Sequence, residues 1–104
     1  RNNDLQILAD DRMPVGKGEK TQSFNLHTIQ IQAGDYLYLY TDGFADQFGG
    51  MKGKKFKYRL LNELIFKNHQ LELSQQYDVL QNTFNTWKGS LEQVDDVCVM
   101  CIKF

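Results

Sequence analysis

The nine residues YLYLYTDGF, numbers 36–44, decide the fold of this chain. Tyrosine and leucine alternate from Tyr36 to Tyr40, so one face of a strand carries three aromatic rings and the other carries leucines. Because both faces are bulky, the pattern favours a strand that is covered on both sides inside a layered sheet. Asp42 and Gly43 follow at once, and glycine lets the backbone turn sharply there.

The segments around this strand predict an α+β fold class. A first strand is expected over Phe24–Gln32, joined to the second by a short glycine-containing connection that is typical of a hairpin. Helices are expected over Phe56–Asn68 and from Ser74 to Gly89, where apolar side chains recur at helical spacing. A last strand is expected from about Asp96 to the C-terminus. The order of elements predicts a mainly antiparallel sheet with two helices.

Two regions are expected to lack long regular elements. Residues 1–22 are polar and rich in turn-forming residues, with a short strand expected only at residues 5–8. Residues 42–55 contain four glycines and are expected to form a loop.

Length and composition limit the class of protein. The 104 residues suit one ordinary domain, and 12 Lys+Arg against 13 Asp+Glu leave a formal net charge of −1. Such a charge gives no strong field to attract nucleic acid or an anionic membrane. No apolar run approaches the ~20 residues of a membrane-spanning helix, and no signal-peptide pattern follows Arg1. Because the chain does not begin with Met, we expect it to be a processed product or a piece of a longer protein.

The two cysteines, Cys98 and Cys101, have a C-x-x-C spacing. The residues around them predict a buried strand, in which side chains three apart point to opposite faces. We therefore interpret both thiols as core-filling side chains, neither paired in a disulfide nor bound to zinc. This use of cysteine indicates a cytoplasmic protein.

Carboxylates stand at the ends of two predicted strands. Asp42 directly follows one strand, while Asp95 and Asp96 stand at the start of the last. If these strands are antiparallel neighbours, Asp42 and Asp95 converge, and adjoining carboxylates repel one another unless a cation neutralises them. Oxygen ligands of this kind suit Mg²⁺ or Mn²⁺. Spacing alone favours the other interpretation, an ordinary Asp-Gly turn and a solvated strand start.

The residues around both aspartate sites resemble a known family. GDYLYLYTDGF at 34–44 and QVDDVCV at 93–99 are similar to the C-terminal half of PPM-type (protein phosphatase 2C-like) serine/threonine phosphatases, in the stage II sporulation protein E branch. ADQFGG at 45–50 and GKKF at 53–56 resemble the version that is attached to bacterial sensory modules. PVG at 14–16 resembles the element that precedes the hairpin in that family.

The resemblance implies that residues 1–104 are a single partial domain, the C-terminal portion of a PPM-type α-β-β-α sandwich. In such an enzyme, two Mn²⁺ or Mg²⁺ ions hold a water that attacks a phosphoserine or phosphothreonine. Asp42 and Asp95 match metal ligands of the family. Gly43 matches the glycine that follows the first ligand, and Asp96 matches a residue that supports the second.

The family's N-terminal half, which carries a further aspartate and a Gly-His-Gly element, has no match in this sequence, and neither His27 nor His69 has that neighbourhood. The resemblance therefore implies metal ligands but no further catalytic residue here, and a chain that is inactive alone. It also implies an upstream sensory or regulatory domain and a phosphorylated signalling protein, such as an anti-sigma-factor antagonist, as substrate. Without the first half, uncovered sheet surface predicts a homodimer.

A basic segment, Lys52–Arg59, carries five positive charges in eight residues. It predicts either a solvated loop and helix start or a docking surface for a phosphorylated or acidic protein at Lys52, Lys54 and Lys55. A non-catalytic binding module that uses this segment is the alternative to the phosphatase. Two carboxylates at adjoining strand ends favour the enzyme, because a binding module has no need of them.

Overall fold

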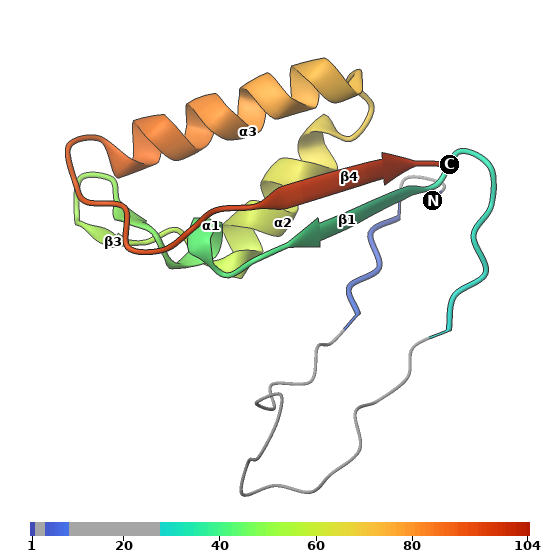
Figure 1. The fold of residues 1–104 in the computed structure, drawn as a ribbon, viewed down its shortest axis with the longest axis horizontal. Helices are drawn as coiled ribbons and strands as arrows, with labels where there is room; N and C mark the ends of the chain where they lie inside the picture. The colour runs from blue at the N-terminus through green and yellow to red at the C-terminus, as the bar shows by residue number, and fades with distance from the viewer. Residues whose placement is uncertain (2–3, 9–27) are drawn as a thin grey trace, which may run out of the picture. The chain divides into compact units, whose positions relative to one another are not determined.

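The structure, a computed structural model, describes residue 1, residues 4–8 and residues 28–104 (Figure 1). The chain divides into two compact units, one of residues 1–35 with Phe104 and one of residues 36–103. The helices and strands of the described residues belong to the second unit. In chain order they are β1 (Tyr36–Tyr40), α1 (Gly43–Asp46), β2 (Phe48–Gly49), β3 (Lys54–Lys55), α2 (Tyr58–Asn68), α3 (Leu73–Lys88) and β4 (Val99–Lys103).

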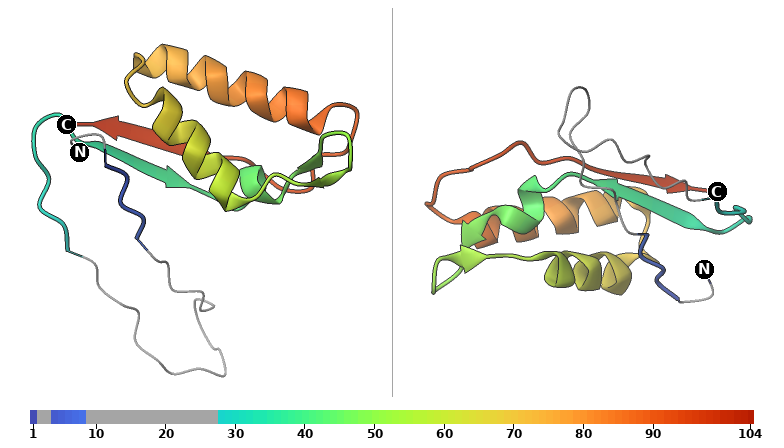
Figure 2. Two further views of the ribbon diagram at one scale, coloured as in Figure 1. Left: turned by 180° about the vertical axis from the view of Figure 1, so that it is seen from behind. Right: turned by 90° about the horizontal axis from the view of Figure 1, so that it is seen from below.

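Strands β1 and β4 are antiparallel neighbours, with Tyr36 opposite Lys103 and Tyr40 opposite Val99. A second antiparallel pair is formed by the short strands β2 and β3. Helices α2 and α3 lie on one side of the β1–β4 sheet (Figure 2). The predicted α+β fold class is confirmed, and the antiparallel pairing brings the end of β1 beside the start of β4.

The apolar core of the second unit joins all three helices. The ring of Phe44 in α1 lies 5.1 Å from that of Phe56 and 5.2 Å from that of Phe84 in α3, measured between centroids. Leu61 and Ile65 of α2 are also buried, and their spacing of four places them on one helix face. Burial of each such side chain is worth about 1.5–3 kcal/mol, so this cluster holds the short α1 between the longer helices.

The tyrosine face of β1 packs toward the helices. The hydroxyl of Tyr38 donates to Oε1 of Gln76 in α3 at 2.6 Å, and that of Tyr40 donates to Oδ1 of Asn62 in α2 at 2.7 Å. Gln76 is buried, and its amide nitrogen also donates to the carbonyl of Leu71 at 2.8 Å. Burial raises the pKa of Tyr38 well above its usual range, so the phenol stays a neutral donor.

The opposite face of the β1–β4 sheet is exposed. Leu39, Met100 and Ile102 are 52%, 50% and 39% exposed. Register places Leu39 opposite Met100 and Leu37 opposite Ile102, so these side chains form one apolar surface. Within the described part of the chain the expected cover on both faces of β1 is not seen, because the two longer helices, α2 and α3, pack on the tyrosine face.

The region expected to be a loop, residues 42–55, contains α1 and the β2–β3 hairpin. The two aromatic anchors Phe44 and Phe56 explain this difference, because burying both requires an ordered backbone between them. Helix α3 begins at Leu73, with Glu72 rather than the expected Ser74 as its N-cap, and ends at Lys88, followed by the predicted stop Gly89, where φ is 54°. Among the described residues, the helices are too short or too polar to cross a membrane.

The prediction of a first strand over Phe24–Gln32 is wrong for those of its residues that the structure describes. Residues 28–32 form no strand, and neither do residues 5–8, since a strand needs a backbone ladder and these segments make none. Residues 24–27 of that strand, His27 and the PVG element at 14–16 lie outside the described residues.

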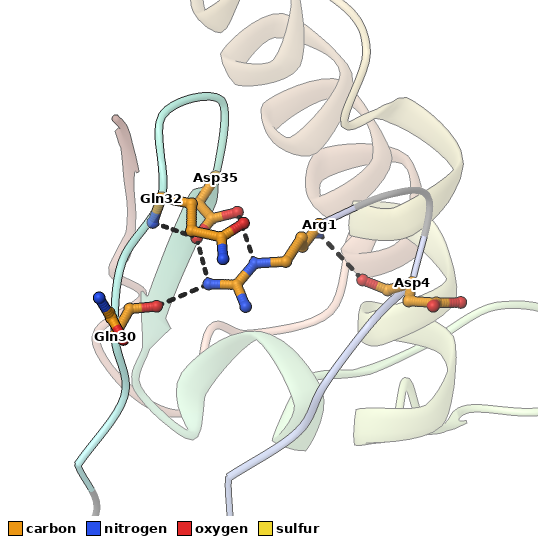
Figure 3. Close-up of polar contacts among 5 residues, drawn as sticks. All are labelled: Arg1, Asp4, Gln30, Gln32 and Asp35. Atoms are coloured by element: carbon orange, nitrogen blue, oxygen red, sulfur yellow. Dashed lines mark hydrogen bonds and ion pairs between the residues drawn. The ribbon is translucent and has the colours of Figure 1, made fainter.

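In the first unit, an ion pair joins Arg1 to Asp35. The guanidinium of Arg1 donates to both carboxylate oxygens of Asp35, from Nε at 3.1 Å and from Nη2 at 2.8 Å (Figure 3). Nη2 also donates to the carbonyl of Gln30, and the backbone N–H of Gln32 donates to Asp35 at 2.8 Å. The hydrogen bonds from Arg1 lower the pKa of Asp35 to about 2.

The cysteines also differ from expectation. Cys98 is exposed and Cys101 is half-buried, and neither is in a disulfide. The prediction of a core position is wrong for Cys98, because β4 begins only at Val99 and the preceding residue lies outside the sheet. Burial raises the pKa of the Cys101 thiol, which faces the helices beside Tyr38.

Candidate metal centre

The backbone beyond β1 is tied to the residues that lead into β4. The N–H of Thr41 donates to the carbonyl of Cys98 at 3.0 Å, and the N–H of Cys98 donates to Oγ1 of Thr41 at 3.1 Å. Oγ1 of Thr41 in turn donates to the carbonyl of Asp96 at 3.4 Å. These bonds extend the pairing of β1 and β4 beyond the pair Tyr40–Val99, up to the two aspartate sites.

Gly43 brings the two aspartate sites into direct contact. It is buried, and a Cβ built on it would lie 2.1 Å from the carbonyl oxygen of Asp96 and 3.1 Å from Cγ2 of Val97. No side chain fits in that space, so the close approach requires glycine. The turn that carries Asp42 therefore rests on the backbone of Asp96, the residue next to Asp95.

The carboxylate of Asp42 is exposed and accepts a hydrogen bond from the hydroxyl of Tyr58. Asp42 precedes α1 but makes no side-chain cap bond to that helix. Its carbonyl accepts from the N–H of Asp46 at 2.9 Å, so the backbone of Asp42 is fixed by α1 while its carboxylate is directed to α2.

Asp95 and Asp96 are both exposed and lie in the segment before β4. The carboxylate of Asp95 accepts from the N–H of Asp96 at 2.7 Å, and its carbonyl accepts from the side-chain amide of Gln93 at 2.9 Å. A shallow hollow at the surface is lined by Gln93, Val94 and these two aspartates. The segment therefore presents carboxylate oxygen to a space that solvent or an ion can enter.

The donor set fits part of a divalent-metal site. Carboxylate oxygens are the hard ligands that Mg²⁺ and Mn²⁺ prefer, and both ions need about six ligands. Within the described ranges, no group of three or more His, Cys, Asp or Glu side chains is placed to hold a metal ion. The carboxylate oxygens near the end of β1 are thus the type of ligand that such an ion prefers. They are too few to complete its coordination, so further ligands would have to come from water or from other residues.

The basic segment, Lys52–Arg59, runs from the turn between β2 and β3 through β3 to the start of α2. Lys52 lies in the exposed turn between the two strands, and Lys54 and Lys55 form β3. The Nζ atom of Lys55 lies 3.8 Å from the carboxylate of Asp46 and 5.8 Å from the centroid of the Phe48 ring. Lys55 is therefore partly engaged within the fold, whereas Lys52 and Lys54 point their charge at the solvent side of the hairpin.

The role of Tyr58 was missed at the level of sequence. It appears there only as an aromatic residue inside a basic run, and its partner Asp42 is 16 residues away. The available signal was its place in the first turn of the predicted helix, close behind a glycine-rich segment. His69, whose sequence neighbourhood does not match the family's histidine element, stacks its ring on that of Phe66 at the end of α2, with centroids 5.1 Å apart.

Comparison with known proteins defines the class. The chain is similar to the SiaA-PP2C domain of Pseudomonas aeruginosa, with a TM-score of 0.74 and 26% sequence identity over 81% of this chain. The match covers 34% of that chain, so the present chain spans only about a third of the length of the structure that it matches. The family Stage II sporulation protein E (SpoIIE) matches residues 1–104, and the chain belongs to this family. No curated protein sequence matches it. The resemblance seen in the two aspartate motifs is confirmed.

Proposed function

We propose that residues 1–104 are the C-terminal part of a metal-dependent protein serine/threonine phosphatase domain. One observation carries the proposal: Gly43 packs against the carbonyl of Asp96, which joins the turn of Asp42 to the segment of Asp95. An ordinary Asp-Gly turn has no need of such contact with a second acidic segment. Membership of the SpoIIE family and the likeness to a PP2C domain support the same conclusion.

In this proposal, Asp42 and Asp95 are metal ligands, and Gly43 and Asp96 support them through the backbone. When bound, two Mn²⁺ or Mg²⁺ ions supply an acidified water and neutralise charge on the phosphoryl oxygens. The chain's own residues contribute oxygen donors and hold them at the joined ends of β1 and β4. We assign no catalytic residue beyond these ligands.

The complete site needs ligands beyond Asp42 and Asp95, and we propose that the other part of the domain supplies them. Residues 1–104 then form a single partial domain that is inactive on its own. We place the whole protein in the cytoplasm, with a sensory or regulatory domain upstream. Its substrate is a phosphorylated signalling protein, for which an anti-sigma-factor antagonist is the best candidate.

We propose that Lys52, Lys54 and Lys55 form the docking surface for this substrate. Lys52 and Lys54 are exposed on the β2–β3 hairpin, where positive charge attracts a phosphorylated or acidic protein surface. The alternative function, a non-catalytic binding module, would use the same segment, Lys52–Arg59. The two functions differ in one testable respect. In a non-catalytic binding module, partner binding would be independent of Asp42 and of metal.

A second copy of the chain is the proposed partner of the exposed sheet face. Leu39, Met100 and Ile102 together present an apolar surface of the kind that protein interfaces cover. A twofold dimer is the commonest way for one chain to cover such a surface with itself.

Mn²⁺ titration of the chain tests the proposal. Asp42→Asn and Asp95→Asn should each weaken Mn²⁺ binding at least tenfold, because each removes a charged oxygen ligand. Asp78→Asn is the matched control, since Asp78 is exposed on α3 and takes no part in the site. Equal Mn²⁺ affinity for all four proteins contradicts the proposal.

A further inference from the structure

Tyr58 makes a contact with Asp42 that no part of the proposed function requires. Its hydroxyl donates to Oδ1 of Asp42, although Tyr58 belongs to α2 and Asp42 follows β1. An aspartate at the surface can satisfy its carboxylate with water. The hydrogen bond from a second element is therefore a constraint on where this carboxylate points.

The backbone before Tyr58 is fixed on both sides. The N–H of Lys57 donates to the carbonyl of Ala45 at 2.8 Å, and the carbonyl of Lys57 accepts from Leu61 at 3.2 Å. Lys57 has φ of 80° and ψ of 151°, a backbone region that glycine alone populates readily, and such strain costs a non-glycine residue about 1–3 kcal/mol. The fold keeps this unfavourable conformation, and it sets the first residue of α2 over the turn that carries Asp42.

The ring of Tyr58 is fixed as well. It stacks on the ring of Tyr40, the last residue of β1, with centroids 6.0 Å apart and an interplanar angle of 29°. The two rings thus connect β1 with α2 directly behind Asp42, and the phenol oxygen of Tyr58 has a defined place.

We propose that Tyr58 is a positioning residue for the metal ligand Asp42. A carboxylate has about four lone-pair sites on two oxygens, so a donor on Oδ1 leaves Oδ2 for a divalent cation. The hydrogen bond removes rotational freedom from the carboxylate before the cation arrives, which strengthens binding through Oδ2. This inference rests on the proposed metal site, and it adds that one member of the basic segment serves the metal ligand rather than a docking partner.

The test compares two single-hydroxyl deletions in the complete chain. Tyr58→Phe removes the donor to Asp42 and keeps the ring, while Tyr40→Phe removes the hydroxyl of the stacking partner and keeps Asp42 untouched. Mn²⁺ affinity is measured from the electron paramagnetic resonance signal of free Mn²⁺. We expect Tyr58→Phe to bind Mn²⁺ about 10-fold or more weakly than Tyr40→Phe, as loss of a partner to a metal ligand typically does.

A second readout separates positioning from stability. In the metal-free chain, the ¹³C resonance of the Asp42 carboxyl should move in Tyr58→Phe and stay in place in Tyr40→Phe. Equal Mn²⁺ affinity for the two tyrosine variants, with Asp42→Asn still impaired, overturns the inference and leaves the proposed function standing. Unchanged affinity in Asp42→Asn overturns the proposed function, and the inference falls with it.

Discussion

Replacement of Gly43 by alanine tests the junction between the two aspartate sites. The new methyl carbon would lie 2.1 Å from the carbonyl oxygen and 2.8 Å from the carbonyl carbon of Asp96. Carbon atoms pack at about 3.5–4.0 Å, so the two segments would have to separate by more than about 1 Å. Both obstructing atoms belong to the backbone, and no change of rotamer relieves the contact.

The direction of the change in stability distinguishes two opposing effects of Gly43→Ala. Gly43 is the first residue of α1, and helix propensity alone predicts that alanine gains about 0.5–1 kcal/mol there. Overpacking predicts the opposite, a loss of about 1–3 kcal/mol, and a clash with backbone belongs at the upper end of that range. We therefore expect Gly43→Ala to reduce the free energy of unfolding by about 3 kcal/mol.

Equilibrium urea unfolding measures this change. For a small protein the slope is about 1–3 kcal/mol per molar urea, so the midpoint should fall by about 1–3 M. Gly53→Ala is the control, because Gly53 has φ of 59° but nothing within 4 Å of a built Cβ. That variant should lose stability through backbone strain alone and keep its Mn²⁺ affinity, which Gly43→Ala should lose. A Gly43→Ala chain as stable as the unsubstituted one refutes the reasoning.

Three further outcomes are expected. The chain alone should not hydrolyse a phosphoserine peptide with excess Mn²⁺, because its ligands are too few to hold two ions; Mn²⁺-dependent turnover that is lost in Asp42→Asn would be the contrary result. Sedimentation should find a dimer that Leu39→Lys converts to a monomer, whereas a monomeric unsubstituted chain contradicts the proposed dimer. The ion pair of Arg1 with Asp35 lowers the pKa of Asp35 from 3.8 to about 2, so its stabilisation is complete above about pH 4 and is lost as pH falls through 2. An NMR titration should return the Asp35 pKa toward 3.8 in Arg1→Gln, and an unchanged pKa would show that the ion pair is not its cause.

The sequence predicts strands β1 and β4 and both long helices well, because their patterns are local and strong, whereas the pairing of β1 with β4 joins distant residues and is left open by the sequence. The tyrosine-leucine alternation identifies β1, and the apolar spacing around Leu61 identifies α2. Gly89 ends α3 as its residue type indicates. Once β1 and β4 pair as antiparallel neighbours, the two aspartate sites lie at one end of the sheet.

The remaining parts of the fold depend on contacts between residues far apart in the sequence, which no local sequence pattern predicts. Helix α1 exists because Phe44 reaches a core formed by residues much later in the chain, and glycine-rich composition hides it. The backbone conformation of Lys57, with φ of 80°, is unexpected for lysine, and it is this residue that sets Tyr58 beside Asp42. The predicted first strand fails for the same reason, since its apolar alternation finds no partner strand among the described residues.

Paramagnetic line broadening tests the central claim, that Asp42 and Asp95 share one divalent cation. Substoichiometric Mn²⁺ is added to the ¹⁵N-labelled chain, and the backbone resonances are followed by NMR. The account predicts that the resonances of residues 42–43 and 95–96 broaden together at the lowest Mn²⁺ concentration, and that Asp42→Asn abolishes the broadening at both places. Broadening at residues 95–96 that persists unchanged in Asp42→Asn would show that the two aspartates bind ions separately, and would contradict the account.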